Sequence, residues 1–146
     1  MILLKLIRNV ELFNGLTDTE LKKIAELCQV KQLKKGETLI KEGDTGDEFF
    51  IISKGAVEVI VNSSQSSPET IINLGAGQLI GEMSLVQSGT RSATVRALHD
   101  NTTVHAIHHD DFHQLCESDA RIGYIIMRNM AADISFKLRH FNLSRN

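Results

Sequence analysis

Four residues near the middle of the chain have types and spacing suited to recognition chemistry: Gly81, Glu82, Arg91 and Ser92. The guanidinium of Arg91 is planar and permanently charged, so it can bond two oxygens of one phosphate group. Gly81 carries no side chain, which allows the backbone N–H groups after it to approach an anion, above all at the start of a helical turn. Ser92 adds a hydroxyl or amide donor. This segment predicts a phosphate site.

A carboxylate at Glu82 would repel a phosphate unless it had another partner. The 2′-hydroxyl of a ribose is one such partner, as in dinucleotide sites. Pairing with Arg91 would also balance its charge. Phosphate and ribose held side by side indicate a nucleotide. An isolated Arg–Glu couple is more often a plain internal ion pair, so the prediction depends on the sequence around the two residues.

Residues 80–95 read IGEMSL, VQSGT and RSATV in succession. This segment resembles the phosphate-binding cassette of the cyclic nucleotide-binding domain family, F-G-E-x-A-L followed after a few residues by P-R-[AST]-A-T-V. The family includes catabolite activator proteins, protein kinase A regulatory subunits and gating domains of cyclic nucleotide-modulated channels. The nine-position separation of Glu82 and Arg91 is that of the kinase-type cassette. The glycine-punctuated pattern extends the resemblance over nearly the whole chain, through Lys35-Gly36-Glu37, Glu42-Gly43-Asp44, residues 49–52, Gly55 and Gly77.

The resemblance implies which residues meet the ligand. Gly81 and Ser84 would offer backbone amides, Glu82 would hold the ribose, and Arg91 and Ser92 would hold the cyclic phosphate. The full set is Gly81, Glu82, Met83, Ser84, Arg91 and Ser92, with an apolar wall of Ile72, Leu74, Leu85 and Ala93.

Three positions depart from the family pattern. Thr90 stands where proline is usual, which loosens the turn before the arginine. Ile80 replaces an aromatic residue, and Ser84 replaces an alanine. None of these changes removes a group that would contact the ligand.

The positioning elements are expected to be mainly β, because short runs of β-forming residues alternate with glycines between residues 31 and 107. That pattern alone fits a sandwich, a jelly roll or a barrel. The resemblance implies a double-stranded β-roll, similar to a jelly roll, with N-terminal helices and two C-terminal helices. We expect a single domain over residues 1–146, with N-terminal helices in 1–30, the roll in 31–107 and C-terminal helices in 108–142.

Local sequence signals predict where helices start and where the chain turns between strands. Thr17 and Glu20 predict a capping box at a helix start. Lys54-Gly55 is expected to be a tight turn between strands at 48–52 and 56–61, and the polar segment 62–69 an exposed hairpin tip. Asp110 is expected to cap a short helix and Ser118 a longer one that runs towards residue 140.

The last helix carries an apolar stripe, which is most simply core, with a homodimer seam as the second interpretation. Its members are Ile122, Ile126, Met130, Ile134, Leu138 and Phe141. The resemblance implies that this helix closes over the base. Its polar candidates for a base cap are Ser135, Lys137 and Arg139, for which plain solvent exposure is an equal alternative.

Composition narrows the function classes. A formal net charge of −2 argues against direct nucleic-acid binding, and no apolar run reaches membrane length. Cys28 and Cys116 fit buried thiols in a reducing cytoplasm. Four histidines, His105, His108, His109 and His113, match no zinc motif and are interpreted as ordinary surface residues, so neither a metal nor a cofactor is expected. No strand-borne histidine array or poised general base suggests an enzyme.

We therefore expect a non-catalytic, cytoplasmic sensor of a cyclic mononucleotide whose C-terminal helices move on binding. Ser92 is compatible with the bases of both cyclic AMP and cyclic GMP. Cyclic AMP is favoured over cyclic GMP only because it is the commoner ligand of bacterial-type relatives. Two alternatives stay open. One is the effector domain of a transcription regulator without its DNA-binding part. The other is a degenerate domain that binds no nucleotide and serves in interaction or dimerisation.

Overall fold

The computed structural model describes residues 2–61, 70–82 and 89–145, in which strands lie between helices at both ends of the chain. The helices are α1 (Ile2–Arg8), the 3-10 helix η1 (Glu11–Phe13), α2 (Asp18–Ala25), α3 (His109–Ser118) and α4 (Ala120–Arg145). The strands are β1 (Gln29–Leu33), β2 (Thr38–Ile40), β3 (Thr45–Gly46), β4 (Glu48–Lys54), β5 (Ala56–Val61), β6 (Thr70–Gly75), β7 (Leu79–Ile80), β8 (Gly89–Thr90), β9 (Thr94–Ala97) and β10 (Thr102–His108).

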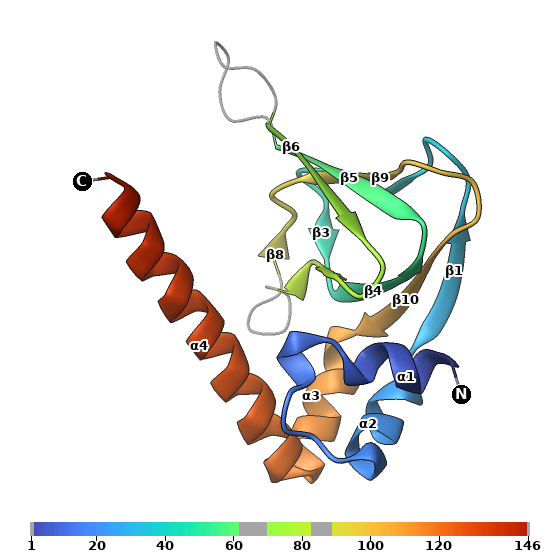
Figure 1. Ribbon diagram of the computed structural model, residues 1–146. Coiled ribbons are helices and arrows are strands. Elements are labelled where there is room, and N and C mark those ends of the chain that lie inside the picture. The colour runs from blue at the N-terminus through green and yellow to red at the C-terminus, as the bar shows by residue number, and fades with distance from the viewer. Residues whose placement is uncertain (1, 62–69, 83–88, 146) are drawn as a thin grey trace.

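Two four-stranded antiparallel sheets form the roll, in the orders β1-β10-β4-β7 and β2-β9-β5-β6, and β3 pairs with β8. Helices α1, α2 and α3 gather at one end of the roll (Figure 1). The expected mainly β, jelly-roll-like fold with flanking helices is therefore confirmed. The roll begins at Gln29, two residues earlier than expected, and β10 ends at His108, one residue later.

The turn at Gly55 carries the chain from one sheet to the other, because β4 and β5 belong to different sheets. Gly55 has φ +80°, and a Cβ built there would lie 2.5 Å from Thr102 Oγ1. Both the backbone conformation and the close approach thus require glycine. The predicted strands on either side are present, while the expected hairpin tip at 62–69 lies outside the described residues.

The capping box of α2 is confirmed: Glu20 N–H donates to Thr17 Oγ1 (3.2 Å) and Thr17 N–H donates to Glu20 Oε1 (2.8 Å). The other two predicted caps are wrong. At α3 the acceptor is the Nδ1 atom of His108, which takes the N–H of Asp110. The strand continues to His108, so that residue is the last extended one and occupies the cap position.

At the start of α4 the Asp119 carboxylate accepts the N–H of Ile122. Ser118, which was expected to cap this helix, instead donates its hydroxyl to the Leu115 carbonyl at the end of α3. The two helices are separated by a single residue, so the carboxylate takes the position after Ser118.

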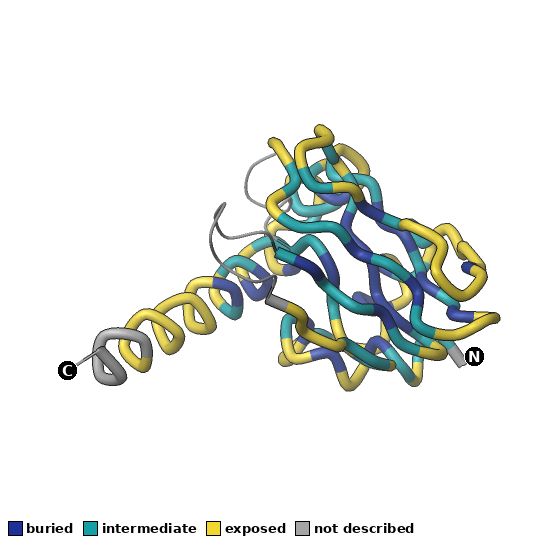
Figure 2. Tube along the Cα trace, turned by 90° about the horizontal axis from the view of Figure 1, so that it is seen from above, coloured by how far each residue is buried: buried dark blue, intermediate teal, exposed yellow. Residues whose placement is uncertain are grey.

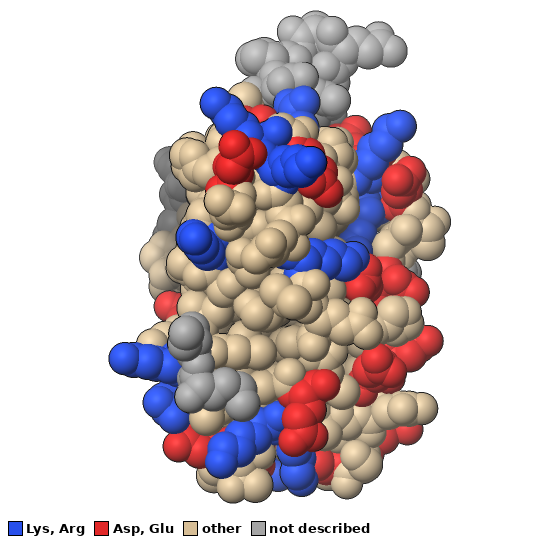
Figure 3. Space-filling view, turned by 90° about the vertical axis from the view of Figure 1, so that its right-hand side faces the viewer, with Lys and Arg blue, Asp and Glu red and all other residues tan. Residues whose placement is uncertain are grey.

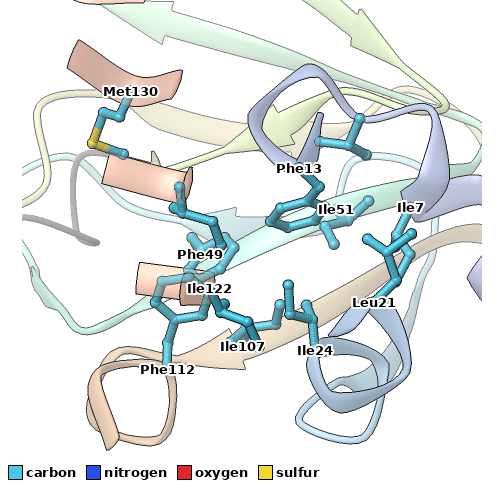
Figure 4. Close-up of a cluster of buried hydrophobic side chains, with 12 residues drawn as sticks. Ile7, Phe13, Leu21, Ile24, Phe49, Ile51, Ile107, Phe112, Ile122 and Met130 are labelled. Carbon is cyan, nitrogen blue, oxygen red and sulfur yellow. The ribbon is translucent and has the colours of Figure 1, made fainter. Parts of the chain in front are cut away.

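Strand β4 is buried on both faces and separates two hydrophobic clusters. Phe49 and Ile51 point into the cluster shared with the helices, where Phe49 meets Phe112 edge-on with ring centroids 5.4 Å apart (Figure 4). Phe50 and Ile52 belong to the cluster inside the roll. The period-two alternation of a strand thus explains a continuous apolar run without any polar face.

Helix α4 is buried only along its first half. Ile122 and Ile126 are fully buried and Met130 nearly so, whereas Ile134 is 37% exposed and Leu138 57% exposed. The second half of α4 projects away from the roll in both views (Figures 1 and 2). The predicted core role therefore holds for the first three stripe residues; the side chain of Phe141 lies outside the described residues.

Charged side chains of both signs lie close together on the face shown in Figure 3. No helix among the described residues has the length and apolar character needed to cross a membrane.

Candidate functional site

A cavity of about 1240 Å³ lies between the roll, the η1 region and α4. Its lining brings together the predicted residues of the phosphate segment, the predicted apolar wall and one predicted base-cap residue: Gly81, Glu82, Arg91, Ser92, Ile72, Leu74, Ala93 and Lys137. Met83, Ser84 and Leu85 were predicted for the same site and lie outside the described residues.

Arg91 is held from three sides by residues 43–48, which we call the arginine cradle. The Arg91 N–H donates to the Asp44 carbonyl (2.7 Å), and the Arg91 carbonyl accepts from the Gly43 N–H (2.9 Å). Its guanidinium donates from Nη2 to the Glu48 carbonyl (2.6 Å). The pairing of β3 with β8 brings the two segments together.

Two glycines give the guanidinium its room. A Cβ built on Gly46 would lie 2.5 Å from Arg91 Nη2 and closer still to Nε and Cζ. At Gly81, φ is +75° and a Cβ would lie 2.8 Å from Nη1. Gly81 was predicted on the ground that the backbone must come close to the ligand. The sequence analysis did not identify Gly46, because only the fold shows that it lies against the guanidinium of Arg91, 45 positions later in the chain.

The charge of Arg91 is partly desolvated. Burial lowers the pKa of Arg91, while the nearby carboxylates of Glu48 and Asp47 raise it. The guanidinium does not pair with Glu82 as the sequence suggested: no ion pair between described residues includes Arg91, and the bond to the Glu48 carbonyl takes that place. A positive group without an ion-pair partner at a cavity wall suits an anionic ligand.

The apolar wall is a ladder across four strands. Val59 on β5 lies opposite Ile72 on β6 and opposite Val95 on β9, and Val95 lies opposite Ile40 on β2. All four line the cavity with Leu74 and Ala93. Sequence reasoning found Ile72, Leu74 and Ala93 but missed Ile40, Val59 and Val95. Val95 lies between the polar residues Thr94 and Arg96, and Val59 follows Glu58; this alternation was the available signal.

Helix α4 lines the cavity with one face, which carries Asn129, Asp133 and Lys137 at intervals of four residues. Lys137 Nζ pairs with Asp133 Oδ2 at 2.9 Å. This hydrogen bond raises the pKa of Lys137, and the charges of Glu82 and Glu11 add to the effect.

The other base-cap candidates, Ser135 and Arg139, are exposed and are not among the described residues that line the cavity. They lie two positions to either side of Lys137, which on a helix turns them towards the opposite face. The i, i+4 spacing from Asn129 was the signal that would have identified the face of α4 that lines the cavity.

Within the described ranges, no three His, Cys, Asp or Glu side chains are arranged to hold a metal ion. Cys28 and Cys116 are free thiols, and burial raises the pKa of each to about 11. They behave as small apolar groups of the core.

Residues 30–119 match the family model described as "Cyclic nucleotide-binding domain". Human cGMP-dependent protein kinase 2 is 32% identical over 109 residues, which are 74% of this chain and 14% of the kinase. The cAMP-dependent protein kinase regulatory subunit of Mycosarcoma maydis is 36% identical over 93 residues, 64% of this chain and 18% of that protein. The chain thus spans less than a fifth of the length of either relative.

Solved structures share the fold over most of the chain. The N-terminal domain of a transcriptional regulator from Streptomyces coelicolor A3(2) superposes with a TM-score of 0.82 at 27% identity, over 97% of this chain and 95% of that one. The catabolite activator protein of Thermus thermophilus superposes with a TM-score of 0.78 at 29% identity, over 92% and 61% of the two chains. With the family model covering more than half of its residues, the chain belongs to the cyclic nucleotide-binding domain family.

Proposed function

We propose that this chain is a non-catalytic regulatory module that binds a cyclic mononucleotide and signals through its C-terminal helices. The observation that carries the proposal is Arg91, which is held in the arginine cradle at the wall of a cavity and has no ion-pair partner among the described residues. An apolar wall on one side and a cation with fixed geometry on the other match a ligand with one flat base and one phosphate.

The roles within the site follow from the chemistry of each group. Arg91 and Ser92 take the cyclic phosphate, with backbone amides of Gly81 and Ser84 beside it. Glu82 accepts a hydrogen bond from the ribose 2′-hydroxyl. Ile72, Leu74 and Ala93 form the wall on which the base rests. For Met83, Ser84 and Leu85, which lie outside the described residues, the proposed roles as a ligand contact, an amide donor and a part of the wall rest on the family resemblance alone.

Cyclic AMP is the proposed ligand ahead of cyclic GMP. The preference rests on the resemblance to bacterial-type domains, while Ser92 suits either base. Relatives named for both nucleotides match the chain, one a cGMP-dependent kinase and one a regulatory subunit of a cAMP-dependent kinase.

The signal would be a shift of population between two positions of α4. Asp133 and Lys137 line the cavity from a helix whose apolar residues Ile134 and Leu138 stand exposed. Closure over the base would bury the side chains of Ile134 and Leu138. Binding must favour the closed position, because a ligand with equal affinity for both would signal nothing.

A second candidate is the effector domain of a transcription regulator, acting as a homodimer through α4. It is favoured by the superposition on a regulator's N-terminal domain over almost the whole chain. The exposed side chains Ile134, Phe136 and Leu138 would supply the dimer contact. Sedimentation with and without nucleotide tests this candidate: a chain that stays monomeric at high concentration in both cases contradicts it.

Calorimetric titration with cyclic AMP and cyclic GMP tests the main proposal. Arg91→Ala should weaken binding by about 2–5 kcal/mol, roughly a thirtyfold to several-thousandfold loss, because the partner of the phosphate disappears. Arg96→Ala is the matched control. Arg96 lies on β9, pairs with Glu58 at 3.4 Å, and is not among the described residues that line the cavity. Equal affinity in Arg91→Ala and wild type would refute the assignment.

A further inference from the structure

His108, the N-cap of α3, and His109, its first residue, hold the arginine cradle from outside the cavity. His108 Nε2 lies 2.9 Å from Asp47 Oδ2, and the His109 N–H donates to the Asp47 carbonyl at 2.6 Å. Register places His108 opposite Glu48, the residue whose carbonyl binds the Arg91 guanidinium. Asp47, which contacts both His108 and His109, directly precedes Glu48, so a step of one residue along the chain separates the start of α3 from the carbonyl that orients Arg91.

The two ring nitrogens of His108 perform separate tasks. Nδ1 accepts the N–H of Asp110 at 3.2 Å and thereby caps α3. A nitrogen that accepts carries no proton, so in the neutral ring the proton sits on Nε2, which donates to Asp47. One side chain therefore caps a helix with one atom and holds the cradle with the other.

We propose that His108 is a positioning residue for the phosphate-binding arginine: through Asp47 it fixes the cradle, and so Arg91, to the start of α3. The inference rests on the proposed function of Arg91. Because α3 packs against α4, the same connection would link the phosphate site to the helix that lines the far side of the cavity.

A contribution to stability does not explain this contact. The His108 side chain is 39% exposed and that of Asp47 57% exposed, and pairs at such positions add little to folding free energy. We attribute a geometric role to the contact: it holds the cradle in place, so that Arg91 is already oriented before the ligand binds. The charged groups around His108 are Asp47, Glu48 and Asp110, and none of them belongs to the cavity lining.

Two substitutions separate the tasks of the ring. In His108→Asn the amide oxygen replaces Nδ1, so the cap stays and the contact with Asp47 is lost. In His108→Gln the amide nitrogen replaces Nε2, so the contact with Asp47 stays and the cap is lost. Thermal unfolding and calorimetric titration with cyclic AMP and cyclic GMP are measured on wild type and both variants.

The proposal expects each variant to change one measurement and to leave the other unchanged. His108→Asn should keep the melting temperature and lose about two- to thirtyfold in nucleotide affinity. His108→Gln should melt at a lower temperature and bind within about twofold of wild type. Affinity that falls only where stability falls, or that stays unchanged in His108→Asn, would overturn it.

The Arg91 Nε–H signal in a proton–nitrogen correlation spectrum, assigned by its loss in Arg91→Lys, gives a readout that needs no ligand. It should shift in His108→Asn and stay in place in His108→Gln. If wild type binds neither nucleotide while the signal follows this pattern, the proposed function fails and the positioning role stands. If the signal is the same in all three proteins, the positioning role fails whatever the nucleotide affinity.

Discussion

Gly46→Ala is the substitution that most directly tests how Arg91 is presented. The added methyl would lie 2.5 Å from Arg91 Nη2, and contact becomes ordinary only at 3.4 Å, so that nitrogen must move by at least about 0.9 Å and the closer atoms Nε and Cζ by more. Its 2.6 Å bond to the Glu48 carbonyl cannot survive such a shift. The backbone tolerates alanine, because φ of Gly46 lies outside the left-handed region.

Folding and binding should therefore separate in this variant. Replacing a glycine at a permissive φ can even stabilise the chain, by about 0.4–1 kcal/mol, through the unfolded state. Nucleotide affinity should fall by about 2 kcal/mol or more, roughly thirtyfold, towards the value of Arg91→Ala. Calorimetric titration and urea unfolding measure the two effects on the same protein.

Gly75→Ala is the matched control for Gly46→Ala. Gly75 also lies in a strand with an unstrained φ, and the nearest atom to a built Cβ is the Gly55 carbonyl oxygen at 3.9 Å. It should bind as wild type does. Unchanged affinity in Gly46→Ala, with the fold intact, would refute the reasoning that this glycine makes room for the guanidinium.

Three further predictions concern other groups of the chain. Glu82→Ala should weaken the binding of cyclic AMP by about 1.5–3 kcal/mol, the value of a hydrogen bond to a charged group, and leave the binding of 2′-deoxy cyclic AMP nearly unaffected. Titration with both ligands checks this. Equal losses for the two ligands would refute the assignment of Glu82 to the ribose 2′-hydroxyl. Cys28 and Cys116, whose pKa values burial raises to about 11, should resist a thiol reagent at pH 8 and react quickly once urea unfolds the chain. Since both folded pKa values lie above the unfolded one, stability should be full below about pH 9 and decline as pH rises towards 11.

The predicted site rests on local signals. The cassette is a continuous run whose resemblance to the family's phosphate-binding cassette singles out Gly81, Glu82, Arg91 and Ser92, and the structure brings these four residues together at the lining of one cavity. The capping box at Thr17 was equally local and is confirmed. Both depend on residues a few positions apart, which a pattern can capture.

The rest depends on pairing between distant segments. Gly46 matters only because β3 meets β8, and Val59 lines the cavity only because β5 lies between β6 and β9. The cap of α3 was missed because β10 continues one residue further than its β-forming run suggested, which moves the cap to His108. A strand's end is set by its partners as much as by its own residues.

The two halves of α4 differ in burial, and this limits the closure proposed above. Ile122 and Ile126 are locked in the core, and Asn129 donates to the carbonyls of Leu12 (2.8 Å) and Asn14 (2.9 Å). After Met130, every described residue up to 140 is exposed. Any closure must therefore bend or swing the part beyond Met130, which carries Asp133 and Lys137 along the cavity. The free energy for that movement has to come from contacts these residues make with the ligand in the closed position alone.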